Sequence, residues 1–290
     1  MPKIGLISDV HGNYQALEAV VDHAEAQDVD TFWFLGDAVN YGPESHRCLN
    51  LLEEIVDPDH WILGNHDQAA LLVHGLAGTI PERIRTHRDA LGFFIADDEA
   101  MLQSLAVTVE QMQLLATNAP IFGDQPEYLR DGDCVLVHGG FRSDRLTRTY
   151  TRYPDDALLE LQALKSRFGR DLPRLMIAGH THIPLCYALT DVSGDPQVEK
   201  FDLARNPISL EAPFHVINPG SVGQPRNGNP NAAYATLETE STRNPARPFV
   251  LGNRATLHFH DVPYAIEKTQ ARMARFQLPP KYAHRLETGR

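Results

Sequence analysis

The chain opens with Lys3-Ile4-Gly5-Leu6-Ile7-Ser8-Asp9-Val10-His11-Gly12, an apolar run that stops at a carboxylate. The apolar residues over 3–8 predict a buried strand, and the polar residues that follow predict a tight turn. Residues 14–27 then place apolar side chains at helical spacing. This order of strand, turn and helix predicts the first unit of an α/β fold.

The same order of elements repeats further along the chain. Two more apolar runs, 31–35 and 60–63, each end at a glycine, and a predicted helix over 43–55 separates them. The pattern is βαβαβ, which predicts parallel strands. Sites in such folds lie at the carboxyl ends of the strands, where the polar turns of this chain lie.

The rest of the chain has a different pattern. Residues 68–118 are mainly helical in pattern, so we interpret them as a small helical insertion or cap within a single domain spanning residues 1–290. From residue 183 the pattern favours antiparallel strands. Parallel strands followed by antiparallel strands predict two sheets packed together with helices outside.

Composition excludes several classes of protein. The chain of 290 residues has 26 Lys and Arg against 38 Asp and Glu, a formal charge of -12, which argues against non-specific nucleic-acid binding. Its three cysteines form no CxxC pair and indicate reduced thiols, so we expect a cytoplasmic protein. We expect no membrane association, because no apolar run reaches spanning length and no signal segment precedes the first strand.

Five short polar motifs follow predicted strands. They offer only carboxylate, imidazole and amide donors, which suit divalent transition metals and exclude a soft thiolate site. Two adjacent metals that share a carboxylate suit in-line displacement at phosphorus. We therefore expect a binuclear metal-dependent phosphoesterase with two divalent ions, whether Mn, Fe, Ni, Co or Zn. The motifs are Asp9-Val10-His11, Gly36-Asp37, Gly64-Asn65-His66-Asp67, His138-Gly139-Gly140 and Gly179-His180-Thr181-His182.

Each motif taken alone also fits a structural role. Asp9 fits a helix N-terminal turn, Asp37 fits an ordinary turn, and a lone histidine such as His138 is more often a core side chain. The motif at residues 64–67 exceeds what a helix cap needs, and Asp67 could orient the imidazole of His66 or raise its pKa. Five such clusters in one chain favour a shared explanation, a metal site.

The order Asp-x-His, Gly-Asp, Gly-Asn-His-Asp, His and Gly-His-x-His resembles that of the calcineurin-like metallophosphoesterases. The stretch Asn218-Pro219-Gly220-Ser221-Val222-Gly223-Gln224-Pro225-Arg226 is similar to a loop of the bacterial and archaeal phosphodiesterase branch of that superfamily. The resemblance covers nearly the whole chain. It implies an α/β (α+β) fold, a four-layer αββα sandwich of two mixed sheets flanked by helices.

The resemblance also implies a role for each motif residue. His66 would act as a general acid on the leaving oxygen or stabilise charge on it, with Asp67 as its orienting partner. A hydroxide that bridges the two metals would attack phosphorus. One metal would be held by Asp9, His11, Asp37 and His182, and the other by Asp37, Asn65, His138 and His180.

Two residues are candidates for binding substrate. Asn13 lies in the polar turn after His11, and Arg226 could pair with a phosphate oxygen as a planar fork. The alternative for Arg226 is a tight structural turn in which it binds a neighbouring carbonyl or carboxylate.

The expected activity is hydrolysis of phosphodiesters, phosphomonoesters or both, on a small phosphoester that could be a nucleotide. A diadenosine-polyphosphate or protein Ser/Thr phosphatase of the same fold is the alternative enzyme class. A non-catalytic metal-binding scaffold is a third interpretation, against which the presence of His66 argues. The natural substrate, the native metal and the oligomeric state stay open.

Overall fold

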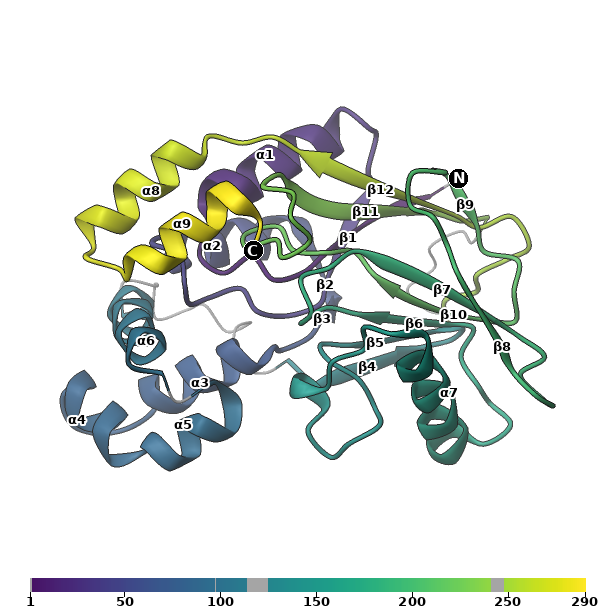
Figure 1. The fold of residues 1–290 in the computed structure, drawn as a ribbon, viewed down its shortest axis with the longest axis horizontal. Coiled ribbons are helices and arrows are strands. Elements are labelled where there is room, and N and C mark those ends of the chain that lie inside the picture. Colours follow the sequence, from purple (N-terminus) through teal and green to yellow (C-terminus); the bar gives the residue numbers. More distant parts are fainter. Residues whose placement is uncertain (1, 97, 114–124, 241–247) are drawn as a thin grey trace.

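Two mixed β-sheets pack face to face, and helices cover their outer faces (Figure 1). The computed structural model describes residues 2–96, 98–113, 125–240 and 248–290. Within these residues each sheet has six strands. The predicted four-layer αββα sandwich is therefore confirmed.

The first sheet contains the N-terminal strands, in the order β3-β2-β1-β11-β12-β9. β1, β2 and β3 are parallel, whereas β1 pairs antiparallel with β11, and β12 and β9 continue the sheet antiparallel. The strand predicted over 60–63 begins earlier than expected. The strands are β1 (Lys3–Ile7), β2 (Thr31–Phe34), β3 (Val56–Trp61), β9 (Ile208–Ser209), β11 (Ala232–Glu238) and β12 (Thr256–Val262).

The second sheet has the order β4-β5-β6-β10-β7-β8. Three adjacent strands, β5, β6 and β10, are parallel; β4 pairs antiparallel with β5, β7 with β10, and β8 with β7. The strands are β4 (Tyr128–Asp131), β5 (Cys134–Val137), β6 (Leu175–Ala178), β7 (Leu185–Thr190), β8 (Gln197–Lys200) and β10 (Phe214–Asn218).

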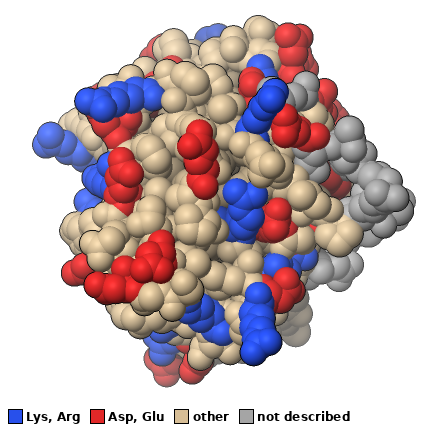
Figure 2. Space-filling model, turned by 90° about the vertical axis from the view of Figure 1, so that its right-hand side faces the viewer, with Lys and Arg blue, Asp and Glu red and all other residues tan. Residues whose placement is uncertain are grey.

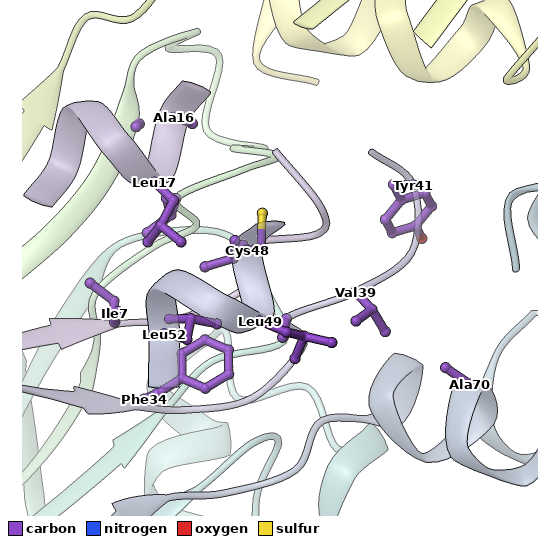
Figure 3. Packing of buried hydrophobic residues seen from close by; sticks show 14 of the residues in the cluster. Ile7, Ala16, Leu17, Phe34, Val39, Tyr41, Cys48, Leu49, Leu52 and Ala70 are labelled. Carbon is purple, nitrogen blue, oxygen red and sulfur yellow. The ribbon is translucent and has the colours of Figure 1, made fainter. Parts of the chain in front are cut away.

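Side chains alternate along the central strands between two cores. On β1, Leu6 belongs to the core between the sheets, whereas Ile7 packs on the helix side. Trp33 and Phe34 of β2 divide in the same way. This is the two-residue period of a strand that is buried on both faces. Figure 3 shows the helix side, where Ile7 and Phe34 lie close to Leu52.

Helices enclose both outer faces of the sandwich (Figure 1). One group covers the first sheet and shares one buried cluster with it, and α7 covers the second sheet. The helices are α1 (Tyr14–Glu25), α2 (Ser45–Ile55), α8 (Ile266–Arg275) and α9 (Pro280–Thr288) on the first sheet, and α7 (Pro154–Phe168) on the second.

The region predicted as an insertion is helical where it is described. Its first helix begins at Asn65, before the predicted boundary, so Asn65 and His66 lie in a first helical turn. Residues 97 and 114–118 of the predicted segment lie outside the described residues. The helices are α3 (Asn65–His74), α4 (Ile80–Thr86), α5 (Arg88–Phe94) and α6 (Glu99–Met112).

The surface is mixed in charge on the face that Figure 2 shows, where Lys and Arg alternate with Asp and Glu. That face offers no continuous basic area for a phosphate backbone, in keeping with the formal charge of -12. In the described parts of the chain, no helix has both the length and the apolar content that crossing a membrane requires.

Candidate metal centre

The candidate centre lies where strand ends of the two sheets meet. Asp9 follows β1 and Asp37 follows β2, so the first sheet supplies two carboxylates. His138 directly follows β5 and His180 follows β6, so the second sheet supplies imidazoles. Asp9 and His138 are 0% exposed and Asp37 is 1% exposed. Residues far apart in the sequence therefore form one buried polar site at the carboxyl ends of the strands.

Three groups of described side chains offer metal-binding atoms at short range. Within each group, one carboxylate oxygen and two imidazole nitrogens lie within 4.8 Å of one another. Oδ2 of Asp37 lies 3.1 Å from Nε2 of His138 and 3.7 Å from Nε2 of His11, so Asp37 lies between these two imidazoles. The amide oxygen of Asn65 lies 3.1 Å from Nε2 of His138. The groups are Asp9, His11 and His182; His11, Asp37 and His66; and Asp37, His138 and His180.

Backbone carbonyls orient three of the imidazoles. Nδ1 of His11 lies 3.0 Å from a carbonyl oxygen, Nδ1 of His138 lies 2.7 Å from another, and Nδ1 of His182 lies 2.6 Å from a third. A carbonyl can only accept, so in each neutral ring Nδ1 carries the proton and Nε2 is left with a free lone pair. The three rings thus present Nε2 to the centre, an arrangement typical of metal-binding histidines.

Each carboxylate is anchored by one oxygen and free at the other. Oδ2 of Asp9 accepts from the hydroxyl of Ser8 at 2.6 Å and from the backbone N–H of His180 at 3.1 Å. Oδ1 of Asp37 accepts from the backbone N–H of His66 at 2.8 Å. Among the described residues, Oδ1 of Asp9, Oδ2 of Asp37 and Nε2 of His180 have no hydrogen-bond partner. Unpartnered buried acceptors are costly, and two bound cations that share Asp37 would satisfy all three.

Burial and charge set the protonation of the imidazoles. Burial holds the pKa of His11 and His182 well below the usual range, which favours the neutral form that binds metals. At His138 burial acts in the same direction, but the carboxylates of Asp37 and Asp9 outweigh it and raise the pKa to about 9. A cation that binds His138 must therefore displace a proton, which makes metal binding dependent on pH.

The backbone around the centre is strained. Asp9, His11, Asp37, His180 and His182 have φ angles of 54°, 48°, 62°, 64° and 58°. This left-handed region is uncommon for residues other than glycine, and such strain concentrates at functional sites. The strain turns each side chain sharply away from its strand and toward the centre.

Glycine is needed where the backbone of the centre is crowded. A Cβ at Gly64 would lie 2.0 Å from Oδ1 of Asp37, and a Cβ at Gly179 would lie 2.0 Å from the hydroxyl of Ser8. The glycines that precede Asn65 and His180 in the sequence motifs therefore allow these turns to approach the carboxylates.

Comparison with known proteins identifies the family. The model of the calcineurin-like phosphoesterase family matches residues 2–210. The chain belongs to this family. A metallophosphoesterase crystal structure from Sphaerobacter thermophilus is 31% identical, with a TM-score of 0.73 over 100% of this chain and 99% of that chain. A hypothetical protein from Pyrococcus horikoshii OT3, 16% identical with a TM-score of 0.68 over 100% of this chain and 99% of that chain, shares the fold.

Sequence relatives agree with this assignment. An uncharacterized protein from Methanocaldococcus jannaschii is 24% identical over 99% of this chain and 98% of its own length. A symmetrical bis(5'-nucleosyl)-tetraphosphatase from Actinobacillus pleuropneumoniae is 27% identical over 63% of this chain and 68% of its own length. The phosphoesterase is therefore a metal-dependent hydrolase of phosphoric esters.

In this phosphoesterase, Asp67 does not take the predicted place beside the His66 ring. Its carboxylate accepts from the backbone N–H groups of Asp37 at 2.7 Å, Ala38 at 2.9 Å and Gly64 at 3.0 Å. Consecutive residues of a helix point about 100° apart, so neighbours in sequence such as His66 and Asp67 do not face each other. Asp67 instead holds the loop after β2 against the start of α3.

Asn40 contacts His66 where Asp67 was expected. Nδ2 of Asn40 lies 2.9 Å from Nδ1 of His66, and Oδ1 of Asn40 accepts from the backbone N–H of Tyr41 at 2.8 Å. Sequence reasoning missed Asn40, although it follows Asp37 closely in the same loop and is a fully buried polar residue. The left-handed φ of 71° at Asn40 directs its side chain toward α3, which a sequence motif does not reveal.

Asn13, a residue predicted to bind substrate, has protein partners for its side-chain amide in this phosphoesterase. Its Nδ2 donates to the carbonyl of Gly223 at 2.8 Å and to the hydroxyl of Tyr264 at 3.1 Å. Its Oδ1 accepts from the N–H of Ala16 at 3.3 Å, as the cap of α1, and from the hydroxyl of Thr269 at 3.0 Å. At 1% exposure, these contacts leave no amide atom of Asn13 for a substrate.

Arg226 lies at the edge of the centre with weak partners. Its guanidinium lies 3.5 Å from the hydroxyl of Tyr41 and 3.4 Å from Oε1 of Gln224, both at the long limit for a hydrogen bond. Burial is the main cause of the lowered pKa of His182, and the positive charge of Arg226 adds to it. A partly buried cation close to the centre, with weak hydrogen bonds of its own, suits an incoming anion.

Proposed function

We propose that the chain hydrolyses small phosphodiesters, phosphomonoesters or both at a centre that binds two divalent cations. The observation that carries this proposal is the set of unpartnered acceptors, Oδ1 of Asp9, Oδ2 of Asp37 and Nε2 of His180, at strand ends of both sheets. One cation would be held by Asp9, His11, Asp37 and His182, and the other by Asp37, Asn65, His138 and His180.

Cations bound there would supply Lewis-acid chemistry, lowering the pKa of a water molecule and neutralising charge on the phosphoryl oxygens. His66 would act on the opposite side of the reaction, at the leaving oxygen. It is a candidate because its ring lies next to the centre, with a centroid 4.9 Å from that of His11. Burial, against the carboxylate of Asp37, lowers the pKa of His66 to about 4 in the absence of cations.

The proton of His66 would lie on Nε2. The amide nitrogen of Asn40 can only donate, so Nδ1 of His66 accepts and the neutral ring carries its proton on Nε2. In this neutral tautomer the ring presents an N–H donor that would stabilise charge on the leaving oxygen, and His66 would act as a general acid only after it takes up a second proton. Arg226 would bind a phosphoryl oxygen and orient the ester.

The substrate class has two candidates. The first is a simple mono- or diester, because the two cations, His66 and Arg226 would be sufficient for its hydrolysis. Dinucleoside polyphosphates are the second, because several relatives bear the name symmetrical bis(5'-nucleosyl)-tetraphosphatase. A protein phosphatase and a non-catalytic scaffold are left as outcomes of the experiment.

The helical segment after the third strand bears on how the chain is divided into domains. We propose one domain in which residues 68–118 are an insertion, because Leu102 and Leu105 of α6 share a buried cluster with Leu49 and Leu52 of α2. A cytoplasmic location stays part of the proposal, supported by three buried free cysteines.

The test uses purified protein supplied in turn with Mn, Fe, Ni, Co or Zn. Its substrates are p-nitrophenyl phosphate, bis-p-nitrophenyl phosphate, diadenosine tetraphosphate and a phosphopeptide, with elemental analysis of bound metal. We expect two cations per chain and turnover of at least one ester. Full metal occupancy without turnover of any substrate would favour the scaffold.

A further inference from the structure

Tyr150 is an exposed aromatic side chain that lies against a candidate metal ligand. The centroid of its ring lies 4.2 Å from that of His180, and the two ring planes make an angle of 40°. Tyr150 is 48% exposed, whereas His180 is 7% exposed. The tyrosine therefore covers the ligand and also presents apolar surface to solvent at the edge of the centre.

The backbone around Tyr150 is held in place. Arg142 donates to the backbone carbonyl of Tyr150 and pairs with the carboxylate of Asp156 at the start of α7. The residues on either side, Thr149 and Thr151, are buried. An exposed ring on an anchored backbone is prepared for a partner, because little conformational freedom is lost when a ligand packs on it.

The position of the ring indicates what it would contact. A group esterified to phosphorus extends outward from the centre toward its edge, where Tyr150 lies beside His180. An aromatic face attracts planar aromatic groups, whatever their hydrogen-bonding pattern. We propose that Tyr150 forms a stacking platform for an aromatic group of the phosphoester, such as a nucleobase. This inference rests on the proposed function and narrows its substrate class.

The same loop offers a matched control. Tyr153 is also exposed, at 62%, but its ring lies near the guanidinium of Arg152, 5.8 Å from the ring centroid, at the start of α7. Replacing Tyr153 removes a comparable amount of exposed aromatic surface without touching His180. A difference between the two positions isolates the contact with the centre.

The test measures equilibrium binding by titration calorimetry on the manganese-loaded full chain, so that it does not depend on turnover. Two ligand pairs are compared, AMP with ribose 5-phosphate and phenylphosphonate with methylphosphonate. The members of each pair differ in their aromatic group and share a phosphoryl or phosphonyl group. The proteins are the parent, Tyr150→Leu, Tyr150→Phe and Tyr153→Leu.

We expect the parent to bind the aromatic member of a pair more tightly, by about tenfold, as base stacking on one aromatic side chain provides. Tyr150→Leu should lose this preference, whereas Tyr150→Phe and Tyr153→Leu should keep it. A preference in the AMP pair identifies a nucleobase as the ligand, and a preference in the phosphonate pair alone identifies a simple aryl group.

Two results would overturn the inference. The first is a parent without preference in either pair, or a preference that Tyr150→Leu retains. The second is equal weakening of all four ligands in Tyr150→Leu, which would show that Tyr150 only packs against His180. The proposed function fails separately, if the parent turns over no phosphoester with any metal.

Discussion

The side-chain amide of Asn40 donates to Nδ1 of His66 across 2.9 Å. The backbone N–H of Tyr41 occupies the amide oxygen of Asn40 at 2.8 Å, so the amide cannot turn round and offer its oxygen to the ring without losing that bond. A neutral orienting partner thus holds the tautomer of His66.

Removal of the Asn40 amide should slow catalysis only through His66. We expect Asn40→Leu to lower kcat by roughly tenfold, as loss of an orienting partner does at metal sites, with little change in bound metal. In a His66→Gln background the same substitution should have almost no effect, because residues that act as a unit are not additive. Additive losses in the double variant would contradict the assigned role of Asn40.

Replacing His66 should lower the catalytic rate without lowering the amount of bound metal. We expect His66→Gln to keep both cations and to reduce kcat by roughly 10²–10⁴-fold, the usual contribution of a general acid. The reduction should be largest for esters with poor leaving groups, which need the proton most. An alkyl phosphoester hydrolysed as fast by the variant as by the parent would rule out His66 as the acid.

Replacing Asp37 should reduce metal binding more than replacing a residue that acts only on the leaving group. We expect Asp37→Asn to abolish activity and to bind less metal than His66→Gln, because Oδ2 of Asp37 lies between the imidazoles of His11 and His138. Manganese should raise the Tm of the parent by selective binding to the folded state, and should raise that of Asp37→Asn much less. Calorimetry and elemental analysis provide the two measurements, and full occupancy in Asp37→Asn would exclude a bridging role.

Arg226 should bind substrate and contribute little to stability. We expect Arg226→Ala to raise KM by about tenfold or more, the effect of losing a hydrogen bond to a charged group, while metal content and Tm change little. Arg205→Ala is the control, since the side chain of Arg205 is 88% exposed and pairs with the exposed Asp202. A destabilised Arg226→Ala protein with unaltered kinetics would instead favour a structural turn.

A buried histidine remote in sequence from the centre should make the fold sensitive to acid. His215 on β10 is 0% exposed, and among the described residues neither of its ring nitrogens has a hydrogen-bond partner. Burial, with the positive charge of Arg174, lowers its pKa from 6.5 to about 4. The unfolded chain takes up a proton near pH 6.5 that the folded chain refuses until about pH 4, so the free energy of unfolding falls as the pH falls through this window.

The size of this loss can be measured with a variant. At about 1.4 kcal/mol for each pKa unit, the lowered pKa corresponds to roughly 3 kcal/mol. We expect His215→Leu to lose less stability than the parent between pH 7 and pH 4.5 in urea unfolding. His284→Leu is the control, because the side chain of His284 is 72% exposed. This variant should lose as much stability as the parent over the same pH range. Equal slopes for His215→Leu and the parent would show that His215 is not the group responsible.

Most of the fold could be predicted from the sequence, because the sequence patterns that indicate strands and helices are local. Apolar runs such as residues 3–8 and 31–35 identify buried strands without reference to the rest of the chain. Their ends identify the polar turns, and the βαβ order then places those turns at one edge of a sheet. The first and last residues of individual strands were harder to predict from the sequence. β3, for example, begins at Val56, because pairing with β2 extends the strand beyond its apolar residues.

By itself, the sequence determined the parallel order of the first strands, the motifs at their ends and the family. Only the tertiary structure decided that Asn40 rather than Asp67 contacts His66. It also decided that the side chain of Asn13 caps α1 and that the ring of Tyr150 covers His180. The physical reason is that strand and helix periodicity depends on neighbouring residues. The direction of a side chain in a loop depends instead on a strained backbone and on partners far along the chain.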